Sequence, residues 1–447
     1  MEFVIKISQF LLSLSLLIIL HELGHFIPAK AFKTRVEKFY LFFDVKFSLF
    51  KKKIGETVYG IGWLPLGGYV KISGMIDESM DTEQMAQEPQ PWEFRSKPAW
   101  QRLIIMLGGV TVNFILAYII YVFVSFVYGD TDFSAASLKD GYWIEHPVLN
   151  DLGFKTGDKI IAIDGENISA HSDVMKKVIS GEEYQIERDG KLQTIEMPED
   201  FLGQLSSRRE KGSLFRLRIP LMIGELVDTL QNKDVDLKEG DILISINNKN
   251  VRYYDQLSSV LDSYKGGNVQ ANFLRENDTI SRSLRVDSDG KLGIIAAQHL
   301  ERFDELGYLE MTRREYTFLQ SFGGGLEKFT DQIVGYWEQL TKIFNPKTGA
   351  YKGLGGFKAI YDIFPATWSW ADFWMLTAFL SIMLGVLNLL PIPALDGGHV
   401  MFLLYEMVSG RKPGDKFMEY AQMVGFVILI ALVLFANGND IFKAVSN

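Results

Sequence analysis

The stretch Phe10-Leu-Leu-Ser-Leu-Ser-Leu-Leu-Ile-Ile-Leu20 runs without interruption into His21-Glu22-Leu23-Gly24-His25. Counted with its flanks, from about Val4 to Ile27, the apolar segment has the length of roughly 20 residues that a helix needs to cross a bilayer. Ionisable side chains at membrane depth are costly, and they mark functional sites. The stretch therefore predicts a membrane helix that carries a functional site near its end.

The spacing of the two histidines indicates a metal site. On a helix, His21 and His25 share one face, so their imidazoles can bind the same zinc ion, with Glu22 beside them as a general base. The alternative is a pair of histidines that only make hydrogen bonds at a helix end. The cost of burying His-Glu-x-x-His in lipid argues against that alternative.

A zinc ion needs a third protein ligand, and the chain has no cysteine to supply it. A metzincin would have Gly and His where this chain has Pro28 and Ala31, so that class is excluded. A gluzincin arrangement would use a downstream glutamate such as Glu37 or Glu56. Both lie in a basic segment without a helical pattern.

A stronger candidate lies in Asn388-Leu-Leu-Pro391-Ile-Pro393-Ala-Leu-Asp396-Gly-Gly-His399. Two prolines interrupt an apolar run here, which a membrane protein tolerates where the freed backbone is buried in protein or lines a cavity. Asp396 follows the break and can complete the ligand set. His399 is another possible ligand, but we expect it behind the ligands, because three protein ligands and water complete a catalytic zinc site.

Composition and charge favour a mixed architecture. Of the 447 residues, 47% are hydrophobic and 23% are charged, which is too apolar for a typical soluble enzyme and too charged for a chain wholly within the membrane. A net charge of −9 disfavours nucleic acid as a partner. Three more stretches can span a bilayer, at about Leu103–Tyr128, Trp374–Leu395 and Tyr420–Phe435.

The distribution of lysine and arginine predicts the orientation. These residues gather between the first and second spans, and again at Arg411–Lys416 between the third and fourth. The positive-inside rule places both segments in the cytoplasm. Residues from about Thr131 to Asp372, together with both termini, are then extracytoplasmic.

The extracytoplasmic segment contains an internal repeat. Leu152–Gly165 is echoed by Leu237–Asn248, with Gly240 lying 83 residues after Gly157. In each copy a Gly-Asp pair precedes an apolar strand that ends in a hairpin turn. The pattern resembles the PDZ domain, which binds extended peptides at a sheet edge. The alternative is two β-rich spacers without a ligand.

Two glycine-rich segments remain. Tyr59–Gly74 contains Gly60, Gly62, Gly67 and Gly68 together with Pro65, and it is too short and too interrupted to span a bilayer. Near the end of the extracytoplasmic segment, Gly323-Gly-Gly325 interrupts an amphipathic stretch and predicts a hinge. That stretch could lie on the membrane surface or cover the catalytic site; an interfacial connector is the alternative.

The two motifs together, His-Glu-x-x-His in the first span and Asn-x-x-Pro-x-Pro-x-Leu-Asp-Gly late in the chain, resemble the site-2 protease family of intramembrane zinc metalloproteases. The insert between the second and third spans resembles the bacterial branch typified by the regulator of sigma-E protease. The family's Gly-Pro-Ile-Gly-Ile-like segment has no proline here, where the chain reads Gly353-Leu-Gly-Gly-Phe.

The resemblance implies roles for individual residues. One zinc ion would be bound by His21, His25 and Asp396, with Glu22 as the catalytic base and Asn388 holding the substrate backbone or the oxyanion. Gly109-Val-Thr-Val-Asn113 resembles an element near the active site, so Asn113 would contact substrate; ordinary helix packing is the alternative. Residues 57–74 resemble a membrane-re-entrant β-hairpin that would clamp substrate through Gly60, Gly62, Gly67 and Gly68, with a cytoplasmic turn as the alternative.

The implied fold is a multi-pass α-helical membrane protein with four transmembrane helices, the re-entrant hairpin and two tandem PDZ-like α+β domains on the extracytoplasmic side. The expected divisions are a first membrane half (1–130), two PDZ-like domains (131–210 and 211–300), a linker with an amphipathic helix (301–372) and a second membrane half (373–447).

The implied function is regulated intramembrane proteolysis in the bacterial inner membrane. The substrates would be single-pass membrane proteins such as anti-sigma factors, or signal-peptide remnants, and the PDZ-like domains could also bind peptides or proteins. Two alternatives are a catalytically silent PDZ-containing scaffold and a membrane-anchored protease that acts on soluble peptides.

The predicted orientation can be tested directly, because the chain has no cysteine of its own. A single cysteine placed within residues 131–372 should react with a membrane-impermeant thiol reagent added from outside the cytoplasm. A cysteine within residues 411–416 should react only after lysis. The reverse pattern would overturn the orientation.

Overall fold

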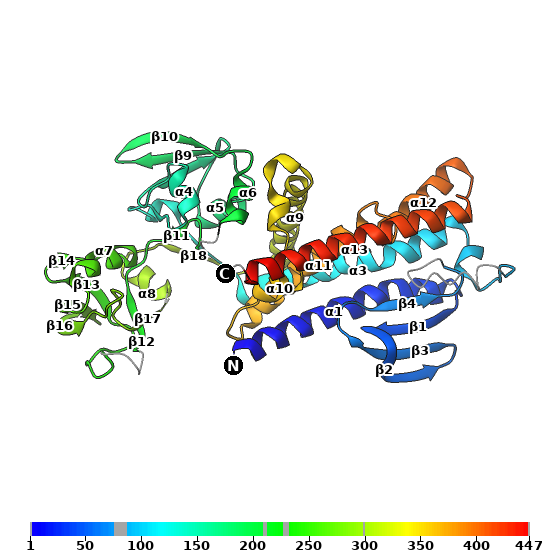
Figure 1. Cartoon of the computed structure of the whole chain (residues 1–447), viewed down its shortest axis with the longest axis horizontal. Coiled ribbons are helices and arrows are strands. Elements are labelled where there is room, and N and C mark those ends of the chain that lie inside the picture. The colour runs from blue at the N-terminus through cyan, green and yellow to red at the C-terminus, as the bar shows by residue number, and fades with distance from the viewer. Residues whose placement is uncertain (1, 76–86, 209–211, 227–231, 298–299, 446–447) are drawn as a thin grey trace. The chain divides into compact units, whose positions relative to one another are not determined.

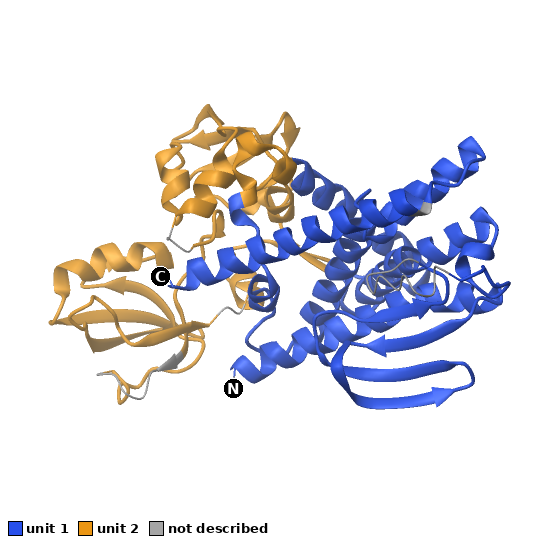
Figure 2. Ribbon diagram, turned by 45° about the vertical axis from the view of Figure 1, so that its right-hand side comes forward, with its two compact units in different colours: residues 1–129, 315–341, 352–447 blue, residues 130–314, 342–351 orange. Residues whose placement is uncertain are grey.

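The structure is a computed structural model that describes residues 2–75, 87–208, 212–226, 232–297 and 300–445. It divides into two compact units (Figure 2). Unit 1 comprises residues 1–129, 315–341 and 352–447, and it holds the long helices. Unit 2 comprises residues 130–314 and 342–351, and it holds two β-rich repeats.

Four described helices of unit 1 are long and apolar enough to cross a membrane (Figure 1), as the sequence predicts. They are α1 (Glu2–Ala31), α3 (Ala99–Tyr128), α11 (Trp370–Leu389) and α13 (Asp415–Val445). The third is shorter than expected, because α11 ends before Pro391 and Pro393, which lack the backbone N–H that a helix needs. The chain becomes helical again at α12 (Asp396–Ser409).

Helices α1 and α3 touch backbone to backbone. A β-carbon placed on Gly24 would lie 2.4 Å from the carbonyl oxygen of Gly108, and one placed on Gly108 would lie 1.9 Å from that of Gly24. Small residues permit this close approach between membrane helices. The contact lies next to His25, so it bears directly on the candidate metal site.

The segment after α1 forms a four-stranded sheet rather than the expected two-stranded hairpin at 57–74. Its strands are β1 (Val36–Leu41), β2 (Phe43–Ile54), β3 (Thr57–Leu64) and β4 (Tyr69–Ile72), in the order β2-β3-β1-β4. Strand β1 lies between the two strands that were expected to pair, parallel to β3 and antiparallel to β4.

The glycines of β3 explain this arrangement. A β-carbon on Gly60 would lie 2.3 Å from the ring of Tyr40, and one on Gly62 would lie 2.2 Å from the carbonyl oxygen of Phe43. Glycine therefore gives the neighbouring backbone and the buried tyrosine ring the space they need. The true hairpin of this sheet is β2–β3.

The hinge expected at Gly323–Gly325 is wrong, because helix α9 (Phe318–Phe344) continues through it. Gly324 faces the ring of Tyr316, and a β-carbon on Gly325 would lie 2.7 Å from the backbone nitrogen of Val122 in α3. The glycines thus permit close packing, whose contacts offset their low helix propensity. A short helix, α10 (Phe357–Asp362), precedes α11.

The longer segment of unit 2, residues 130–314, begins and ends on a pair of strands, β5 (Asp130–Phe133) and β18 (Met311–Arg314). Its first repeat contains a sheet with the strand order β10-β9-β7-β8. The strands are β7 (Lys159–Ile163), β8 (Glu166–Asn167), β9 (Glu183–Arg188) and β10 (Lys191–Glu196). The helices are α4 (Pro147–Asp151), α5 (His171–Lys177) and α6 (Phe201–Ser207). A small pair, β6 (Tyr142–Trp143) and β11 (Arg216–Leu217), places residues 216–217 with the first repeat rather than the second.

The second repeat has the order β16-β15-β13-β12-β17, with β14 beside β13. Its elements are β12 (Met222–Leu226), β13 (Ile242–Ile246), β14 (Lys249–Asn250), α7 (Leu257–Leu261), β15 (Asn268–Arg275), β16 (Asp278–Arg285) and β17 (Ile294–Ala297), followed by α8 (Leu300–Glu305).

The same ion pair stabilises the turn in both repeats. In the first, Arg188 donates from Nε and Nη2 to the two carboxylate oxygens of Asp158, both at 2.6 Å. In the second, Arg275 donates in the same way to Asp241, at 2.9 and 2.8 Å. Both aspartates are buried, and bidentate pairing compensates a buried carboxylate well. The internal repeat that the sequence predicts therefore extends to the same Asp–Arg pair in each copy.

The glycine contact between α1 and α3 predicts a large effect of a small change. Gly24→Ala should lower the free energy of unfolding by on the order of 1–3 kcal/mol, because the added methyl group meets backbone that cannot move aside. Thermal unfolding of the purified chain in detergent would measure it. Gly438→Ala in α13 is a matched control, since among the described residues no heavy atom other than its neighbours and its own helix backbone lies within 4 Å of a β-carbon there. Equal midpoints for the two variants would contradict the packing argument.

Candidate active site

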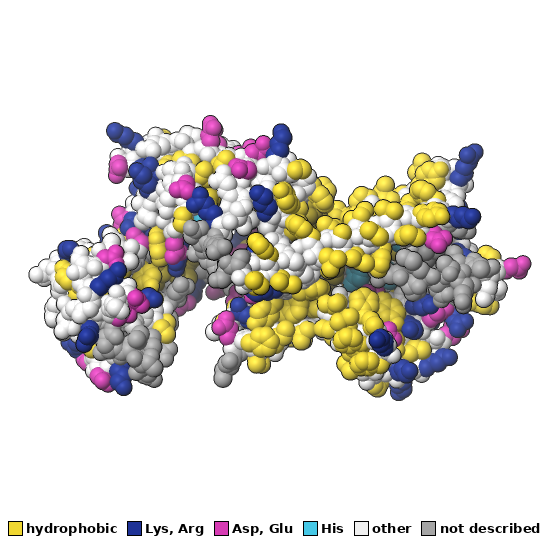
Figure 3. Space-filling model, in the orientation of Figure 1, with side chains coloured by type: hydrophobic (Ala, Val, Ile, Leu, Met, Phe, Trp, Pro, Cys, Tyr) yellow, Lys and Arg dark blue, Asp and Glu magenta, His cyan; other side chains and the backbone are white. Residues whose placement is uncertain are grey.

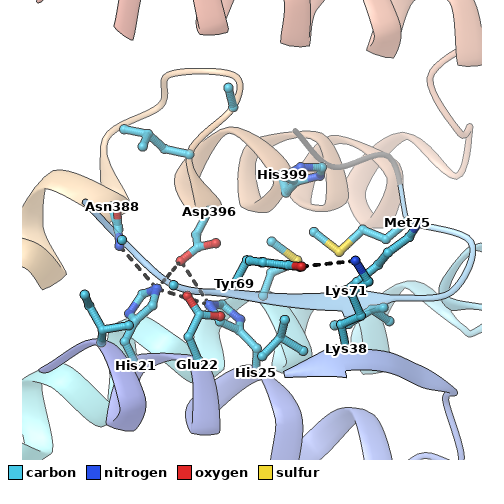
Figure 4. Close-up of a pocket in the computed structure, with 18 of the residues that line it drawn as sticks. His21, Glu22, His25, Lys38, Tyr69, Lys71, Met75, Asn388, Asp396 and His399 are labelled. Carbon is cyan, nitrogen blue, oxygen red and sulfur yellow. Dashed lines mark hydrogen bonds and ion pairs between the residues drawn. The ribbon is translucent and has the colours of Figure 1, made fainter. Parts of the chain in front are cut away.

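Two elements bring three metal-ligating side chains together (Figure 4). His21 and His25 lie one turn apart on α1, and Asp396 is the first residue of α12. Oδ2 of Asp396 is 3.5 Å from Nε2 of His21 and 3.3 Å from Nε2 of His25. The two Nε2 atoms are themselves 3.3 Å apart.

These distances suit a zinc ion. Ligand atoms roughly 2.1 Å from a tetrahedral zinc lie about 3.3–3.5 Å from one another, which is the separation found here. Oδ2 of Asp396 is buried and has no hydrogen-bond partner among the described residues. A buried carboxylate oxygen without a partner is costly, and a cation at the centre of the cluster would satisfy it.

Contacts on the far side of each imidazole fix its orientation. Nδ1 of His25 lies 2.8 Å from the carbonyl oxygen of Ile105, so Nδ1 carries the proton and Nε2 presents its lone pair to the cluster. Nδ1 of His21 lies 3.1 Å from the side-chain amide of Asn113. Oδ1 of that amide is buried and has no hydrogen-bond partner among the described residues. If Oδ1 and Nδ2 of Asn113 exchange places, Oδ1 accepts the proton on Nδ1 of His21.

Gly109 makes room for both rings. A β-carbon at this position of α3 would lie 2.4 Å from Nε2 of His25 and 2.9 Å from Nδ1 of His21. Ser381 of α11 donates a hydrogen bond of 2.8 Å to the carbonyl oxygen of Asn113. Helix α3 is thereby held between the helix that bears the histidines and the helix that precedes Asp396.

The cluster lies in the wall of a cavity of about 620 Å³ within unit 1. Glu22 and Asn388 line the cavity near the cluster (Figure 4), and Gly68 lines it as well. The side-chain amide of Asn388 lies 3.3 Å from Nε2 of His21. Gly68 allows the turn before β4 to approach α1, since a β-carbon there would lie 2.4 Å from Ile18 and 3.6 Å from Glu22.

The opposite part of the cavity is lined by polar residues of the sheet. Tyr69 donates a hydrogen bond of 2.8 Å to Asp44 and accepts one of 3.3 Å from Lys38. Lys71 lies 3.7 Å from Glu37. Strand β4 therefore contributes Tyr69–Ile72 to the cavity wall, while β1 and β2 add the charged side chains of Lys38 and Asp44.

The structure brings most of the sequence-predicted site residues together, but not all. Glu22, Asn388, Gly67 and Gly68 line the cavity together with the three proposed ligands. Three residues expected to bind substrate are not in its described lining: Gly60, Gly62 and Asn113. The two glycines pack inside the sheet, and Asn113 is fully buried behind His21.

His399 also lines the cavity but does not join the cluster of His21, His25 and Asp396. Its Nε2 lies 2.7 Å from Nε2 of Gln422 in α13. His399 therefore lies outside the ligand cluster, and its expected place behind the ligands stays a prediction. Gln422 was missed by sequence reasoning, although an amide within an apolar span is a signal of buried polar contact.

Comparisons with known proteins agree with these observations. A match to the family described as peptidase family M50 covers residues 9–432. A Campylobacter jejuni protein named as a zinc metalloprotease is 27% identical over 97% of this chain and 92% of its own. The regulator of sigma E protease of Haemophilus influenzae is 25% identical over 99% of this chain and 100% of its own.

The contact between Asn113 and His21 predicts a role in metal affinity. Asn113→Leu keeps the size of the side chain but removes the acceptor for Nδ1 of His21, so zinc affinity should fall about 10–100-fold. Competition with a fluorescent chelator would measure it. Thr111→Leu, at an exposed position of the same helix, should leave the affinity unchanged. An Asn113 variant with native affinity would show that the amide only packs.

Proposed function

The chain belongs to peptidase family M50, the site-2 protease family of zinc metalloproteases, and from this premise we propose that it hydrolyses a peptide bond within a membrane-spanning segment of a single-pass protein. The observation that supports the intramembrane position is the location of the cluster. His21 and His25 lie within α1, a helix apolar enough to cross a bilayer. A site that acts on soluble peptides would not need this placement.

In this proposal His21, His25 and Asp396 hold one zinc ion through Nε2, Nε2 and a carboxylate oxygen. When bound, zinc supplies a Lewis acid that acidifies water and polarises the scissile carbonyl. The protein's own contribution is to fix the three ligand atoms at the observed separations. Gly109, Asn113 and the carbonyl of Ile105 hold the imidazoles in place.

Glu22 is the proposed general base. It follows His21 directly on α1 and lines the cavity next to the cluster. Its carboxylate can accept a proton from the attacking water and pass that proton to the leaving amide nitrogen. The side-chain amide of Asn388, beside His21, can donate a hydrogen bond to the oxyanion that forms on the attacked carbonyl.

A helical substrate must unwind before it can be cut, because its carbonyls are otherwise hydrogen-bonded within the helix. Strand β4 suits the unwound segment. It is an edge strand of the sheet, paired on one side with β1, and its residues Tyr69–Ile72 line the cavity. An extended substrate could add to this edge through main-chain hydrogen bonds, with Gly67 and Gly68 leaving room at its end.

The remaining parts of the proposal concern location and selection. We place the chain in the bacterial inner membrane, with both termini and the two PDZ-like repeats outside the cytoplasm. There the repeats would exclude proteins whose external domains are still large, or bind peptides. Anti-sigma factors and signal-peptide remnants are the proposed substrates; the name of the Haemophilus relative supports the first.

A catalytically silent scaffold is the second candidate, because the repeats alone could support binding. The intact cluster and the position of Glu22 favour the protease, since binding through the repeats needs neither. A reporter assay separates the two. In membranes or detergent, the native chain should cut a single-span reporter, and Glu22→Gln should slow cutting by about 10²–10⁴-fold.

Metal content separates the proposed roles of the site residues. Asp396→Asn should lose both cutting and zinc, whereas Glu22→Gln should keep its zinc, as measured by elemental analysis of the purified protein. Asp362→Asn is a control at an exposed carboxylate on α10, and it should retain both properties. Cutting by Glu22→Gln at the native rate would exclude Glu22 as the base.

A further inference from the structure

Helix α13 is the least enclosed of the four described helices that can cross a membrane. Apolar side chains cover the region of α13 in Figure 3, which has the orientation of Figure 1. Among the residues of α13 whose burial the structure describes, only Gln422, Gly425 and Asp440 are buried. The contacts of these residues therefore show where the rest of unit 1 holds the helix.

Two of these buried residues meet the turn that carries Asp396. Gln422 and Gly425 are three residues apart, so they lie on one face of α13. A β-carbon on Gly425 would overlap the carbonyl oxygen of Pro393. The side-chain amide of Gln422 lies 2.7 Å from Nε2 of His399. Since Pro393 and His399 stand three residues before and after Asp396, α13 contacts the chain on both sides of the proposed third ligand.

The contact between Gln422 and His399 is polar but lies among apolar helices. Both side chains are buried, with 6% and 8% of their surface exposed. An amide within a membrane helix is costly unless it is paired. If α13 served only to cross the membrane, an apolar side chain would suit position 422 better. The pair therefore indicates a specific attachment of α13 to α12.

The turn before Asp396 has limited means of its own to hold that side chain in place. Pro391 and Pro393 have no backbone N–H to donate. Ala394 has a φ of 82°, in a region that residues other than glycine rarely adopt. Such a backbone persists only where its surroundings hold it. The close approach of Gly425 to Pro393, next to Ala394, supplies a contact of this kind.

We propose that Gln422 and Gly425 are positioning residues for the metal site. Through the chain on either side of Asp396, they hold its carboxylate against the two histidines of α1. Neither residue belongs to the cluster of ligand atoms. This role rests on the zinc site of the proposed function, and it gives α13 a task besides crossing the membrane.

The other end of α13 offers a control within the same helix. Asn437 accepts a hydrogen bond of 3.3 Å from the backbone N–H of Phe357. It lies 15 residues beyond Gln422, which is roughly 22 Å at a rise of about 1.5 Å per residue. Loss of this contact loosens α13 without touching the turn at the metal site.

The test measures metal binding by the full chain in detergent, and it needs no substrate. Each purified variant is freed of metal and titrated with Zn²⁺ against a fluorescent chelator, and then with Co²⁺, whose visible absorption reports the geometry of its ligands. Gln422→Met keeps the length of the side chain but removes its hydrogen bond to His399. Zinc affinity should fall about 10–100-fold, and the cobalt absorption should change, because Asp396 is no longer held in place.

Matched variants separate positioning from stability. Asn437→Leu should lower the midpoint of thermal unfolding but leave zinc affinity and cobalt absorption native. Gly425→Ala should weaken zinc binding at least as much as Gln422→Met, because its methyl group displaces Pro393. Gly438→Ala should change neither property, since apart from its neighbours and its own helix backbone no described heavy atom lies within 4 Å of a β-carbon there.

Two outcomes would refute the positioning role. The first is native zinc affinity together with native cobalt absorption in Gln422→Met. The second is an equal loss of affinity in Asn437→Leu, which would mean that α13 acts only through the stability of the fold. If Gly425→Ala does not fold, the comparison of the other two variants decides alone. A native chain that binds neither metal would instead refute the ligand set itself, and the positioning role with it.

Discussion

The backbone contact between Gly24 and Gly108 is the constraint on which the candidate site depends. It brings α3 so close to α1 that Gly109 lies under both imidazoles and the carbonyl of Ile105 reaches His25. Larger residues would separate the helices and move every group that orients the histidines. The metal site is therefore a property of the packing of two helices as much as of the His-Glu-x-x-His motif.

The third ligand depends on a different constraint, the interrupted helix between α11 and α12. Pro391 and Pro393 end one helix, and the chain then turns through Ala394, whose φ of 82° lies in a region that residues other than glycine rarely adopt. A β-carbon on Gly397 would lie 2.3 Å from the carbonyl oxygen of Leu390. The turn is thus compact, and it places Asp396 at the first position of α12, facing the histidines.

The polar contacts around the site lie among apolar helices. Amides and hydroxyls such as Asn113 and Ser381 are fully buried among apolar helices, where an unmatched polar group is costly. Each contact fixes how one helix lies against the next, from α11 to α3 to α1. The sheet differs, because its β2–β3 hairpin exposes both apolar and basic side chains.

The sequence by itself determined the four spans, the internal repeat and the face shared by His21 and His25, because hydropathy, turn residues and the spacing of four residues on a helix are local properties. Asp396 lies far along the chain, and it was assigned to the same site through the resemblance of its motif to that of the site-2 proteases; the structure brings the three side chains together. Only the tertiary structure decided the rest. Strand β1 lies between β3 and β4, α9 continues through Gly323–Gly325, and Asn113 contacts His21 instead of the cavity. The physical reason is that a glycine or an asparagine has the same local preferences wherever it stands, and its role depends on what packs against it.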